Sequence, residues 1–423
     1  MKGRGRDEVV VHVDMWEDAE PRRSGWLRRA GSGQRADLSF AYVPAWLDAP
    51  DAFTLEPSLL LAAGEQRRRE GGLHGIFSDA APDRWGRTLL ERREILLAKR
   101  EGRRPRSLDD WDVLLGVNDA TRMGALRFAR PGDGAFIDDQ PLSVPPKASL
   151  RDLEAAADRI ERGVKATDGE VDRWLETLIA PGASLGGTRP KATFENTDGA
   201  LWIAKFPAPN DRRDVGAWEY VLARLATEAG IDVPPHDLLS LGSAYHTFAA
   251  RRFDREGSHR RLFASAMTLL DARDHVSGVS YLDIAEAIQL RGAPTARAIE
   301  ADLEQLFRRV VFNALAGHRD DHLRNHGFLH DGAGWRLAPA FDQNPIPDKA
   351  THELAFDKMN TLPDLGTIAG TAGSYRLRAA RAAAIASEVG AAISRWREVA
   401  TKVGIDRDEQ ELIASAFAPE PRR

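Results

Sequence analysis

The stretch His318–Phe328 reads HRDDHLRNHGF and places Asp320 and Asn325 five residues apart. In phosphoryl-transfer loops with this spacing, the aspartate orients the attacking hydroxyl and the asparagine holds a magnesium ion. The spacing selects Asp320 over its neighbour Asp321, which is expected either to assist it or to cap or bond the loop backbone. The stretch therefore predicts a kinase-like catalytic loop.

The same stretch contains His318, His322 and His326, which raise the alternative of a histidine metal cluster. Loops that transfer phosphoryl groups commonly carry a histidine that supports the loop itself. We therefore expect these histidines to shape the loop rather than to ligate a metal together.

A second acidic signal lies seventeen residues past Asn325, in Ala340-Phe341-Asp342. An acid behind an apolar pair is where a kinase-like fold places its second metal ligand, although Gln343 stands where a glycine is usual. The alternative is an ordinary surface turn. The position of Asp342 downstream of the catalytic loop favours the metal ligand.

A glycine-rich turn, Gly182–Lys191, lies upstream and reads GASLGGTRPK. Its glycines let successive backbone N–H groups approach and cradle a phosphate, and Arg189 or Lys191 adds positive charge. Taken alone, a turn of this composition is more typical of a plain hairpin. Its place ahead of a strand that carries a lysine favours a phosphate loop.

That strand is Leu201–Phe206, LWIAKF, and Lys205 lies within it. A lysine inside an apolar strand is costly unless its charge is paired, so Lys205 is predicted to bind phosphate. The alternative is an edge lysine that faces water. Glu219, on the helix that follows, is the candidate ion-pair partner of Lys205.

Composition limits the class of protein. The 423 residues are too many for one simple core, and two or three domains are expected. Because the chain has no cysteine, disulfides, thiolate catalysis and cysteine-based zinc sites are excluded. A net charge of −5 gives no global attraction to nucleic acid or to anionic membranes. The basic N-terminus lacks an apolar signal core, so a cytoplasmic location is expected.

The order of the predicted elements indicates the fold class. Strands are predicted over 9–13, 38–43, 192–195, 201–206 and 245–252, with a turn over Asn196–Gly199. From Ser280 onward the chain is expected to be mostly helical, and Leu303–Leu315 has the period of a buried helix that runs into the catalytic loop. A sheet-rich part followed by a helix-rich part predicts an α+β, bilobal protein-kinase-like fold with an N-terminal β-rich subdomain.

The domain boundary is predicted from Pro131–Pro146, which is rich in Pro, Gly and Asp and has no sustained period. We expect an N-terminal subdomain over 1–130 and a linker over 131–148. An N-lobe-like region with the phosphate loop and the lysine should cover 149–255. A helical lobe with the catalytic loop and the metal-binding aspartate should cover 256–423.

Together these residues resemble the HipA toxin kinases of bacterial type II toxin–antitoxin systems, and the resemblance covers nearly the whole chain. Asp320–Leu329 is its most specific part. The other similar segments belong to the family's N-terminal subdomain, phosphate loop, ATP-lysine strand and lobe connection, and they are 73–90, 114–128, 184–191, 204–207 and 251–255. Two positions depart from the family: His318 stands where asparagine is usual, and Arg251 where an acid is usual.

The resemblance implies a serine/threonine protein kinase that uses ATP and Mg²⁺, with Asp320 as the catalytic residue and Asn325 and Asp342 as the metal ligands. It implies autophosphorylation of Ser184 as well. The residues expected to contact the nucleotide are Ser184, Gly186, Gly187, Lys191, Lys205, Arg251, Phe253, His322, Asn325 and Asp342.

The resemblance also implies partners. Known members phosphorylate a host protein, for example a translation component such as an aminoacyl-tRNA synthetase, and thereby arrest growth. A small helix-turn-helix antitoxin neutralises them, and the complex binds operator DNA. For this chain, DNA binding is expected only through the antitoxin, and no membrane partner is expected.

Two other functions stay open at this point. A small-molecule phosphotransferase of the aminoglycoside or choline kinase type shares the His-x-Asp-x-x-x-x-Asn loop and a downstream aspartate. The long N-terminal region and the missing glycine after Asp342 speak against it. The other alternative is a non-catalytic nucleotide-binding component of a repressor complex.

Overall fold

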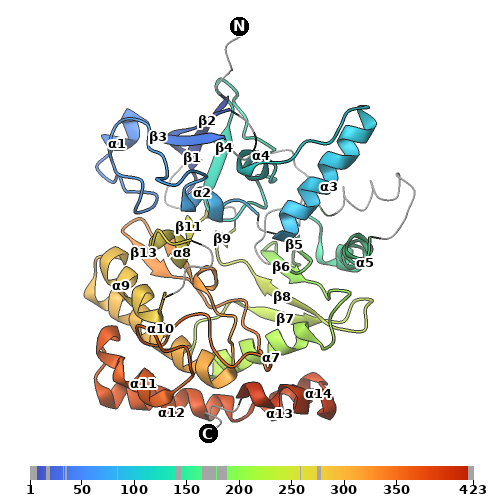
Figure 1. Ribbon diagram of the computed structural model, residues 1–423, viewed down its shortest axis with the longest axis vertical. Coiled ribbons are helices and arrows are strands. Elements are labelled where there is room, and N and C mark those ends of the chain that lie inside the picture. The colour runs from blue at the N-terminus through green and yellow to red at the C-terminus, as the bar shows by residue number, and fades with distance from the viewer. Residues whose placement is uncertain are drawn as a thin grey trace. The chain divides into compact units, whose positions relative to one another are not determined.

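The computed structural model describes residues 7–15, 20–31, 33, 36–82, 84–138, 144–163, 178, 188–257, 259–273 and 278–417 (Figure 1). The chain forms two compact units. The first comprises residues up to Asn210 together with Asp254–Ala264, and the second comprises Asp211–Phe253 together with Ser265–Arg423. Both contain helices and strands, as the α+β prediction required.

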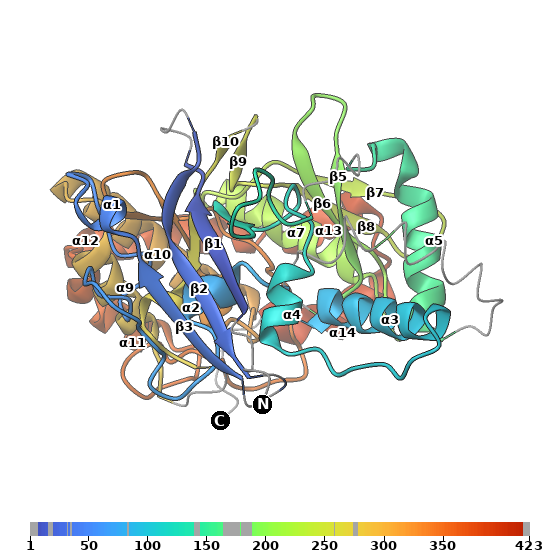
Figure 2. The ribbon, with the colours of Figure 1, turned by 90° about the horizontal axis from the view of Figure 1, so that it is seen from above.

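The first unit contains a four-stranded antiparallel sheet with strand order β3-β2-β1-β4. Figure 2 shows β1, β2 and β3 side by side. The strands are β1 (Asp7–Val13), β2 (Arg22–Ala30), β3 (Asp37–Tyr42) and β4 (Leu126–Ala129). The sheet confirms the predicted strands at 9–13 and 38–43.

Strand β2, with the sequence RRSGWLRRA, was not predicted, because the residues between the first two predicted strands were interpreted as a glycine-containing connection. Its arginines are neutralised across the sheet: Arg28 pairs with Glu8 at 3.1 Å and Arg29 with Asp7 at 2.6 Å. Gly25 lies so close to β3 that a Cβ atom there would stand 2.3 Å from the Phe40 ring. Cross-strand ion pairs and close packing, rather than alternation, therefore fix β2 in the sheet.

The other elements of the first unit surround this sheet or follow it in the chain. The helices are α1 (Pro44–Leu47), α2 (Gly75–Asp79), α3 (Arg84–Arg100), α4 (Asp110–Leu115) and α5 (Leu150–Glu161). The strands are β5 (Lys191–Glu195), β6 (Leu201–Lys205), β9 (Arg255–Glu256) and β10 (His259–Arg260), and β11 (Phe263–Ser265) stands where the chain enters the second unit. The antiparallel pair β5–β6 confirms the predicted hairpin.

The described part of the predicted linker packs onto the first unit. Ile137 donates its N–H to the carbonyl oxygen of Phe128 at 2.7 Å, and the Asn118 side chain donates to the carbonyl oxygen of Asp138 at 3.0 Å. Further along, Glu195 donates its N–H to the carbonyl oxygen of Pro145 at 2.9 Å. Residues 131–138 and 144–148 are thus hydrogen-bonded to other residues of that unit.

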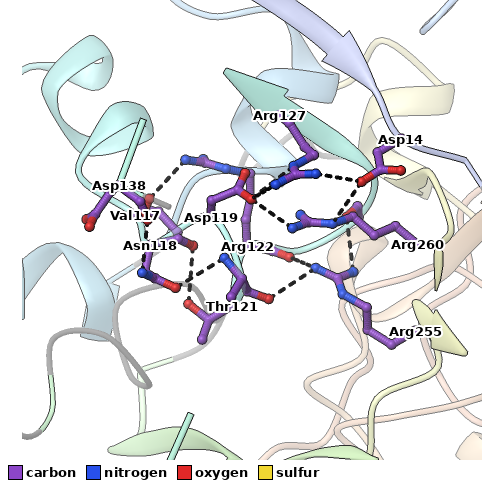
Figure 3. A network of polar contacts seen from close by, with 12 residues as sticks. Asp14, Val117, Asn118, Asp119, Thr121, Arg122, Arg127, Asp138, Arg255 and Arg260 are labelled. Atoms are coloured by element: carbon purple, nitrogen blue, oxygen red, sulfur yellow. Dashed lines mark hydrogen bonds and ion pairs between the residues drawn. The ribbon is translucent and has the colours of Figure 1, made fainter. Parts of the chain in front are cut away.

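A buried network of charged groups fastens Asp254–Ala264 to the first unit (Figure 3). Asp254 accepts from the Gly124 N–H at 2.8 Å and from Arg255 Nη1 at 2.6 Å. Arg260 Nη2 binds Asp119 Oδ2 at 2.9 Å, and Arg255 Nη2 binds the carbonyl oxygen of Arg122 at 2.6 Å. Because these groups are buried, each charge depends on its partners.

We expect Asp254→Ala to lower the free energy of unfolding by about 3–5 kcal/mol, because it leaves the buried Arg255 guanidinium without its carboxylate. Urea unfolding of the full chain measures this loss. Glu256→Ala is the matched control, since Glu256 is exposed and pairs with Arg261 at 3.4 Å; it should change stability by less than about 0.5 kcal/mol. Equal effects of the two substitutions would contradict the prediction.

The second unit is built around α10 (Ala296–Ala316), which begins after the capping side chain of Thr295 and ends at Gly317. It packs against α9 (Tyr281–Arg291) and α12 (Ala379–Ile393); Figure 1 shows α12 below it. This helix confirms the predicted buried helix that leads into the catalytic loop. None of the described helices is long and apolar enough to cross a membrane.

Other elements complete this unit. They are α7 (Val215–Glu228), β7 (His236–Leu239), β8 (Thr247–Arg251), α8 (Ala266–Leu269), β12 (Gly327–His330), β13 (Trp335–Leu337), α11 (Leu365–Gly370), α13 (Trp396–Val403) and α14 (Arg407–Ile413). The part of the chain after Ser280 is mostly helical, as predicted, and the hairpin β12–β13 is an element within it that was not predicted. Each of its strands has four residues or fewer, too short for an alternation signal.

Buried polar side chains on α10 hold the hairpin in place. Asp302 accepts two hydrogen bonds from Arg336, at 2.9 and 3.0 Å, and one from the Leu337 N–H at 3.1 Å. Arg309 donates to the carbonyl oxygen of Ala338 at 2.6 Å. The helix therefore positions both the catalytic loop at its end and the segment that leads to Asp342.

Candidate active site

The predicted catalytic loop leaves α10 through a tight turn at Gly317. This residue has φ +61°, and a Cβ atom there would lie 2.3 Å from the carbonyl oxygen of Ala416. Only glycine satisfies both conditions without strain. Gly317 accepts a hydrogen bond from the Ile346 N–H at 2.9 Å, so the loop starts against the segment that follows Asp342.

Asp320 is the exposed acid of the loop, and 58% of its side-chain surface is accessible. Its Oδ1 lies 2.5 Å from Nζ of Lys349. The side-chain amide of Asn325 donates to the carbonyl oxygen of Asp320 at 3.4 Å, which ties the two predicted residues together. Asp320 is therefore presented to solvent from a fixed backbone, as the acceptor of a substrate hydroxyl would have to be.

Asp321 has the opposite environment, with 1% of its surface accessible. Its Oδ2 receives the Tyr281 hydroxyl at 2.6 Å and the Asn313 amide at 2.8 Å, and it lies 2.9 Å from Nε2 of His326. Burial opposes the charge, yet His326 and His318 outweigh it and hold the pKa of Asp321 well below its usual range. Asp321 therefore hydrogen-bonds the side chains of Tyr281, Asn313 and His326, whereas the sequence suggested a helper of Asp320 or a partner of the loop backbone.

The three histidines of the loop separate into two groups. His322 is exposed, whereas His318 and His326 are buried on either side of Asp321. Burial disfavours the charged His318 ring, but the neighbouring Asp321 carboxylate raises its pKa above the ordinary value. Within the described ranges, no group of three or more His, Cys, Asp or Glu side chains is arranged to hold a metal ion.

His318, the position that departs from the family pattern, supports the loop. Its Nδ1 lies 3.1 Å from the oxygen and 3.2 Å from the nitrogen of the Asn344 main chain. Its Nε2 lies 3.6 Å from Asp321 Oδ1. The ring thus links the catalytic loop to the chain just after Asp342.

Asp342 is half-buried and has φ +60°, a left-handed conformation that costs a non-glycine residue about 1–2 kcal/mol. The preceding Phe341 packs on Phe253, with ring centroids 5.4 Å apart. The structure thereby brings together the predicted adenine-binding segment and the predicted metal-binding segment. The amide oxygen of Asn325 and the carboxylate of Asp342 are hard oxygen donors, which suit Mg²⁺.

Arg251 ends β8 and is engaged through its main chain. Its N–H donates to the carbonyl oxygen of Pro235 at 2.8 Å. An adenine base at this segment would therefore be read by backbone groups other than this N–H. Glu219, the proposed partner of Lys205, lies buried on α7 of the second unit.

The predicted phosphate-binding lysines lie in the first unit, on the β5–β6 hairpin. Lys191 and Lys205 are directly opposite each other in the register of the two strands. Two like charges at opposed positions repel each other. Arg189 lies at the same end of the hairpin, where Nη2 donates to the carbonyl oxygen of Phe206 at 3.2 Å. Ser184, Gly186 and Gly187 lie outside the described residues.

Several residues around the catalytic loop had no signal in its motif. Tyr281, Lys349 and Glu353 come from segments distant in sequence, and no spacing rule points to them. Asn313 did carry a signal: it is a polar residue on the buried face of α10, where an apolar residue is usual.

His352 lies between Lys349 and Glu353 in the chain. Its ring is buried against the ring of Phe356, with ring centroids 4.8 Å apart. Burial, and then nearby His318, lower the pKa of His352 to about 3, while Asp321 opposes this and Arg319 adds to it. The folded protein therefore keeps this ring neutral down to a lower pH than the unfolded chain does.

Between pH 6.5 and 5, His352 binds a proton in the unfolded chain but stays neutral in the folded chain. The free energy of unfolding therefore falls as the pH falls. The expected loss is about 2 kcal/mol at this residue. Wild type should therefore lose about 2 kcal/mol more than His352→Gln over this range, measured by urea unfolding at both values. Parallel losses in the two proteins would contradict the lowered pKa.

Comparison with known proteins agrees with these features. A family model described as the HipA-like C-terminal domain matches residues 183–396, and one described as the HipA N-terminal domain matches residues 14–129. Among solved structures, HipA of Shewanella oneidensis, in a complex with HipB and operator DNA, superposes with a TM-score of 0.65 and 16% identity. The match covers 97% of this chain and 95% of that one, and it confirms the predicted fold class.

Two curated relatives have kinase names. The chain is 25% identical over 331 residues to "Putative kinase Y4mE" of Sinorhizobium fredii. This alignment covers 73% of this chain and 72% of the relative. It is 29% identical over 191 residues to a "Putative kinase" of Haemophilus influenzae, covering 40% of this chain and 54%, about half, of the relative. The C-terminal family model spans 214 of the 423 residues, from 183 to 396. The chain therefore belongs to the HipA-like family.

Proposed function

We propose that this chain is an ATP- and Mg²⁺-dependent serine/threonine protein kinase that acts as the toxin of a type II toxin–antitoxin system. The main support is the environment of Asp320. Its carboxylate is exposed, and it lies on a loop that the buried Asp321 holds in place by its hydrogen bond with Asn313. Membership of the HipA-like family and the kinase names of curated relatives support it.

In this proposal each site residue has one role. Asp320 orients the substrate hydroxyl and accepts its proton. Asn325 and Asp342 would hold Mg²⁺, which supplies positive charge to the phosphates when bound. Lys191 and Lys205 bind phosphate oxygens, since their opposed positions on the hairpin concentrate positive charge. Phe253 and its neighbours contact the adenine.

We extend the proposal to Ser184, the serine of the glycine-rich turn. A phosphate there adds about −1.5 to −2 charge at pH 7 and would compete with ATP for the same N–H groups and cations. Mass spectrometry after incubation with Mg-ATP should find phosphate on Ser184 in wild type and none in Asp320→Asn. Undiminished ATP affinity of fully phosphorylated protein would contradict a regulatory role.

The proposed partner is a helix-turn-helix antitoxin. The Shewanella structure contains HipA with HipB and operator DNA, which supports a complex of this kind. Because this chain carries a net charge of −5, it should bind DNA weakly by itself. Sequence-specific operator binding by the isolated chain in a mobility-shift assay would refute this part of the proposal.

One experiment tests the activity and separates the alternatives. The purified protein is incubated with γ-labelled ATP and a host lysate, and labelled proteins are identified, with Asp320→Asn as the inactive control. We expect label on one or a few proteins, for example a translation component such as an aminoacyl-tRNA synthetase. Label confined to small molecules would favour a small-molecule phosphotransferase. ATP binding without any transfer would favour a non-catalytic component.

A further inference from the structure

Lys349 lies outside the catalytic motif, yet its side chain binds the carboxylate of Asp320. Its Nζ lies 2.5 Å from Oδ1 of Asp320 and 2.9 Å from Oε1 of Glu353, so one ammonium group bridges two acids. We propose that Lys349 is a positioning residue for phosphotransfer: it fixes the Asp320 carboxylate in the orientation that receives the substrate hydroxyl. The inference rests on the proposed kinase function.

The carboxylate of Asp320 is engaged on one side. Oδ1 is bound by Lys349, whereas Oδ2 has no hydrogen bond to any residue in the part of the chain that the structure describes. With 58% of the side chain accessible, Oδ2 is open to a hydroxyl from solvent or substrate. A carboxylate clamped through one oxygen presents the other in a fixed direction, which is the geometric requirement for an orienting group.

The residues on both sides of Lys349 are hydrogen-bonded to the catalytic loop. On one side, Ile346 donates its N–H to Gly317 at 2.9 Å, and its carbonyl oxygen accepts from Arg319 Nη1 at 2.5 Å. On the other side, Glu353 donates its N–H to the carbonyl oxygen of Arg319 at 3.3 Å. The segment between Ile346 and Glu353 is therefore tied to the catalytic loop at both ends, which distinguishes this ion pair from a chance contact of two surface side chains.

Glu353 determines how Lys349 is held. Burial opposes the charge of Lys349, but the hydrogen bonds that it donates to Asp320 and Glu353 raise its pKa above the ordinary value. The lysine therefore stays charged at neutral pH. Glu353 also accepts from the ammonium group, so Lys349 is held between two carboxylates.

In the step that this arrangement serves, the hydroxyl oxygen of a serine or threonine forms a bond to the γ-phosphorus of ATP. The bond between that phosphorus and the bridging oxygen breaks, and ADP leaves with that electron pair. The hydroxyl proton passes to Oδ2 of Asp320. Lys349 touches none of the reacting atoms and acts through Asp320 alone.

The test compares Lys349→Ala and Lys349→Arg with wild type in the full chain, measuring kcat and the KM for ATP. We expect Lys349→Ala to lower kcat about 10–100-fold and to leave the KM for ATP within about twofold, since orientation is lost and nucleotide contacts remain. Lys349→Arg should recover most of the loss, because arginine can make the same ion pair.

Lys402→Ala is the matched control. Lys402 forms an exposed ion pair of similar length with Glu398, 2.6 Å, on α13. Both lysine-to-alanine variants should leave the unfolding midpoint nearly unchanged, because exposed ion pairs contribute about 0–1 kcal/mol. Only Lys349→Ala should lower kcat.

The outcomes are distinguishable. If wild type transfers phosphate and Lys349→Ala matches its kcat, the inference is wrong and the kinase stands. A rise in the KM for ATP with unchanged kcat would assign Lys349 to nucleotide binding and overturn the inference as well. If wild type transfers no phosphate, the proposed function fails and the positioning role fails with it.

A second measurement does not depend on activity. Amine acetylation followed by mass spectrometry reports how strongly Lys349 is held, since a bound ammonium group reacts slowly. Asp320→Asn should raise the labelling of Lys349 and leave that of Lys402 unchanged. Equal labelling of Lys349 in both proteins would show that the ion pair does not form in solution, which overturns the inference.

Discussion

Asp320→Asn is expected to lower kcat for phosphotransfer by about 10²–10⁴-fold and to leave the fold intact. The substitution keeps the shape of the side chain but removes the group that takes the hydroxyl proton. Because Asp320 is exposed, stability should change by less than about 0.5 kcal/mol. Transfer of label from ATP measures the first effect, and urea unfolding the second.

Asp348→Asn is the control for this experiment. Asp348 is an exposed acid in the same segment as Lys349, and its side chain makes no hydrogen bond or ion pair with residues 318–328, all of which the structure describes. Its replacement should therefore leave kcat unchanged. If Asp348→Asn were inactive and Asp320→Asn active, the assignment of the catalytic aspartate would be wrong.

The neighbouring substitution, Asp321→Ala, is expected to lower the free energy of unfolding by about 3–5 kcal/mol. It leaves the Tyr281 hydroxyl, the Asn313 amide and the buried His326 without their shared acceptor. The burial of Asp321 is the reason for this large expected loss. Urea unfolding at pH 7 measures the loss, and Asp320→Ala, one residue away, is the control.

The pH dependence gives a further check on Asp321. Since its folded pKa is depressed, its contribution is complete above the unfolded value of about 3.9 and is lost only as the pH falls further. The carboxylate also raises the pKa of His318, so this part of its contribution is complete below the ordinary histidine value and is lost as the pH rises through the raised one. The difference in stability between wild type and Asp321→Ala should therefore be larger at pH 5 than at pH 8. Unchanged stability of Asp321→Ala would show that the loop does not depend on the buried cluster.

Local patterns predicted the elements whose cause is local. The β5–β6 hairpin has alternating apolar residues around a turn, and α10 has a helical period of apolar residues. β2 was missed because acids on β1 neutralise its arginines, and a pairing between strands is invisible within one of them. Sequence reading therefore succeeded where neighbours along the chain decide the conformation.

The same distinction holds at the site. The spacing within one loop identified Asp320 and Asn325, and the structure places them in contact through the Asp320 main chain. Tyr281 and Lys349 reach the loop from 40 and 29 residues away in the chain, the separations of their hydrogen bonds to Asp321 and Asp320. Only the folded structure shows which distant side chains support a motif.

The segment Asp254–Ala264 has a consequence for dissecting the protein. It lies within the C-terminal family model, over 183–396, whereas Gly124 and Asp119, which bind it, lie within the N-terminal one, over 14–129. A gene fragment that starts after residue 130 would keep Asp254 and Arg260 but discard Gly124 and Asp119, so the segment would lose the hydrogen bond and the ion pair that hold it in the folded chain. Truncations at the apparent domain boundary should therefore aggregate or be degraded, whereas co-expression of the two fragments should restore a soluble pair.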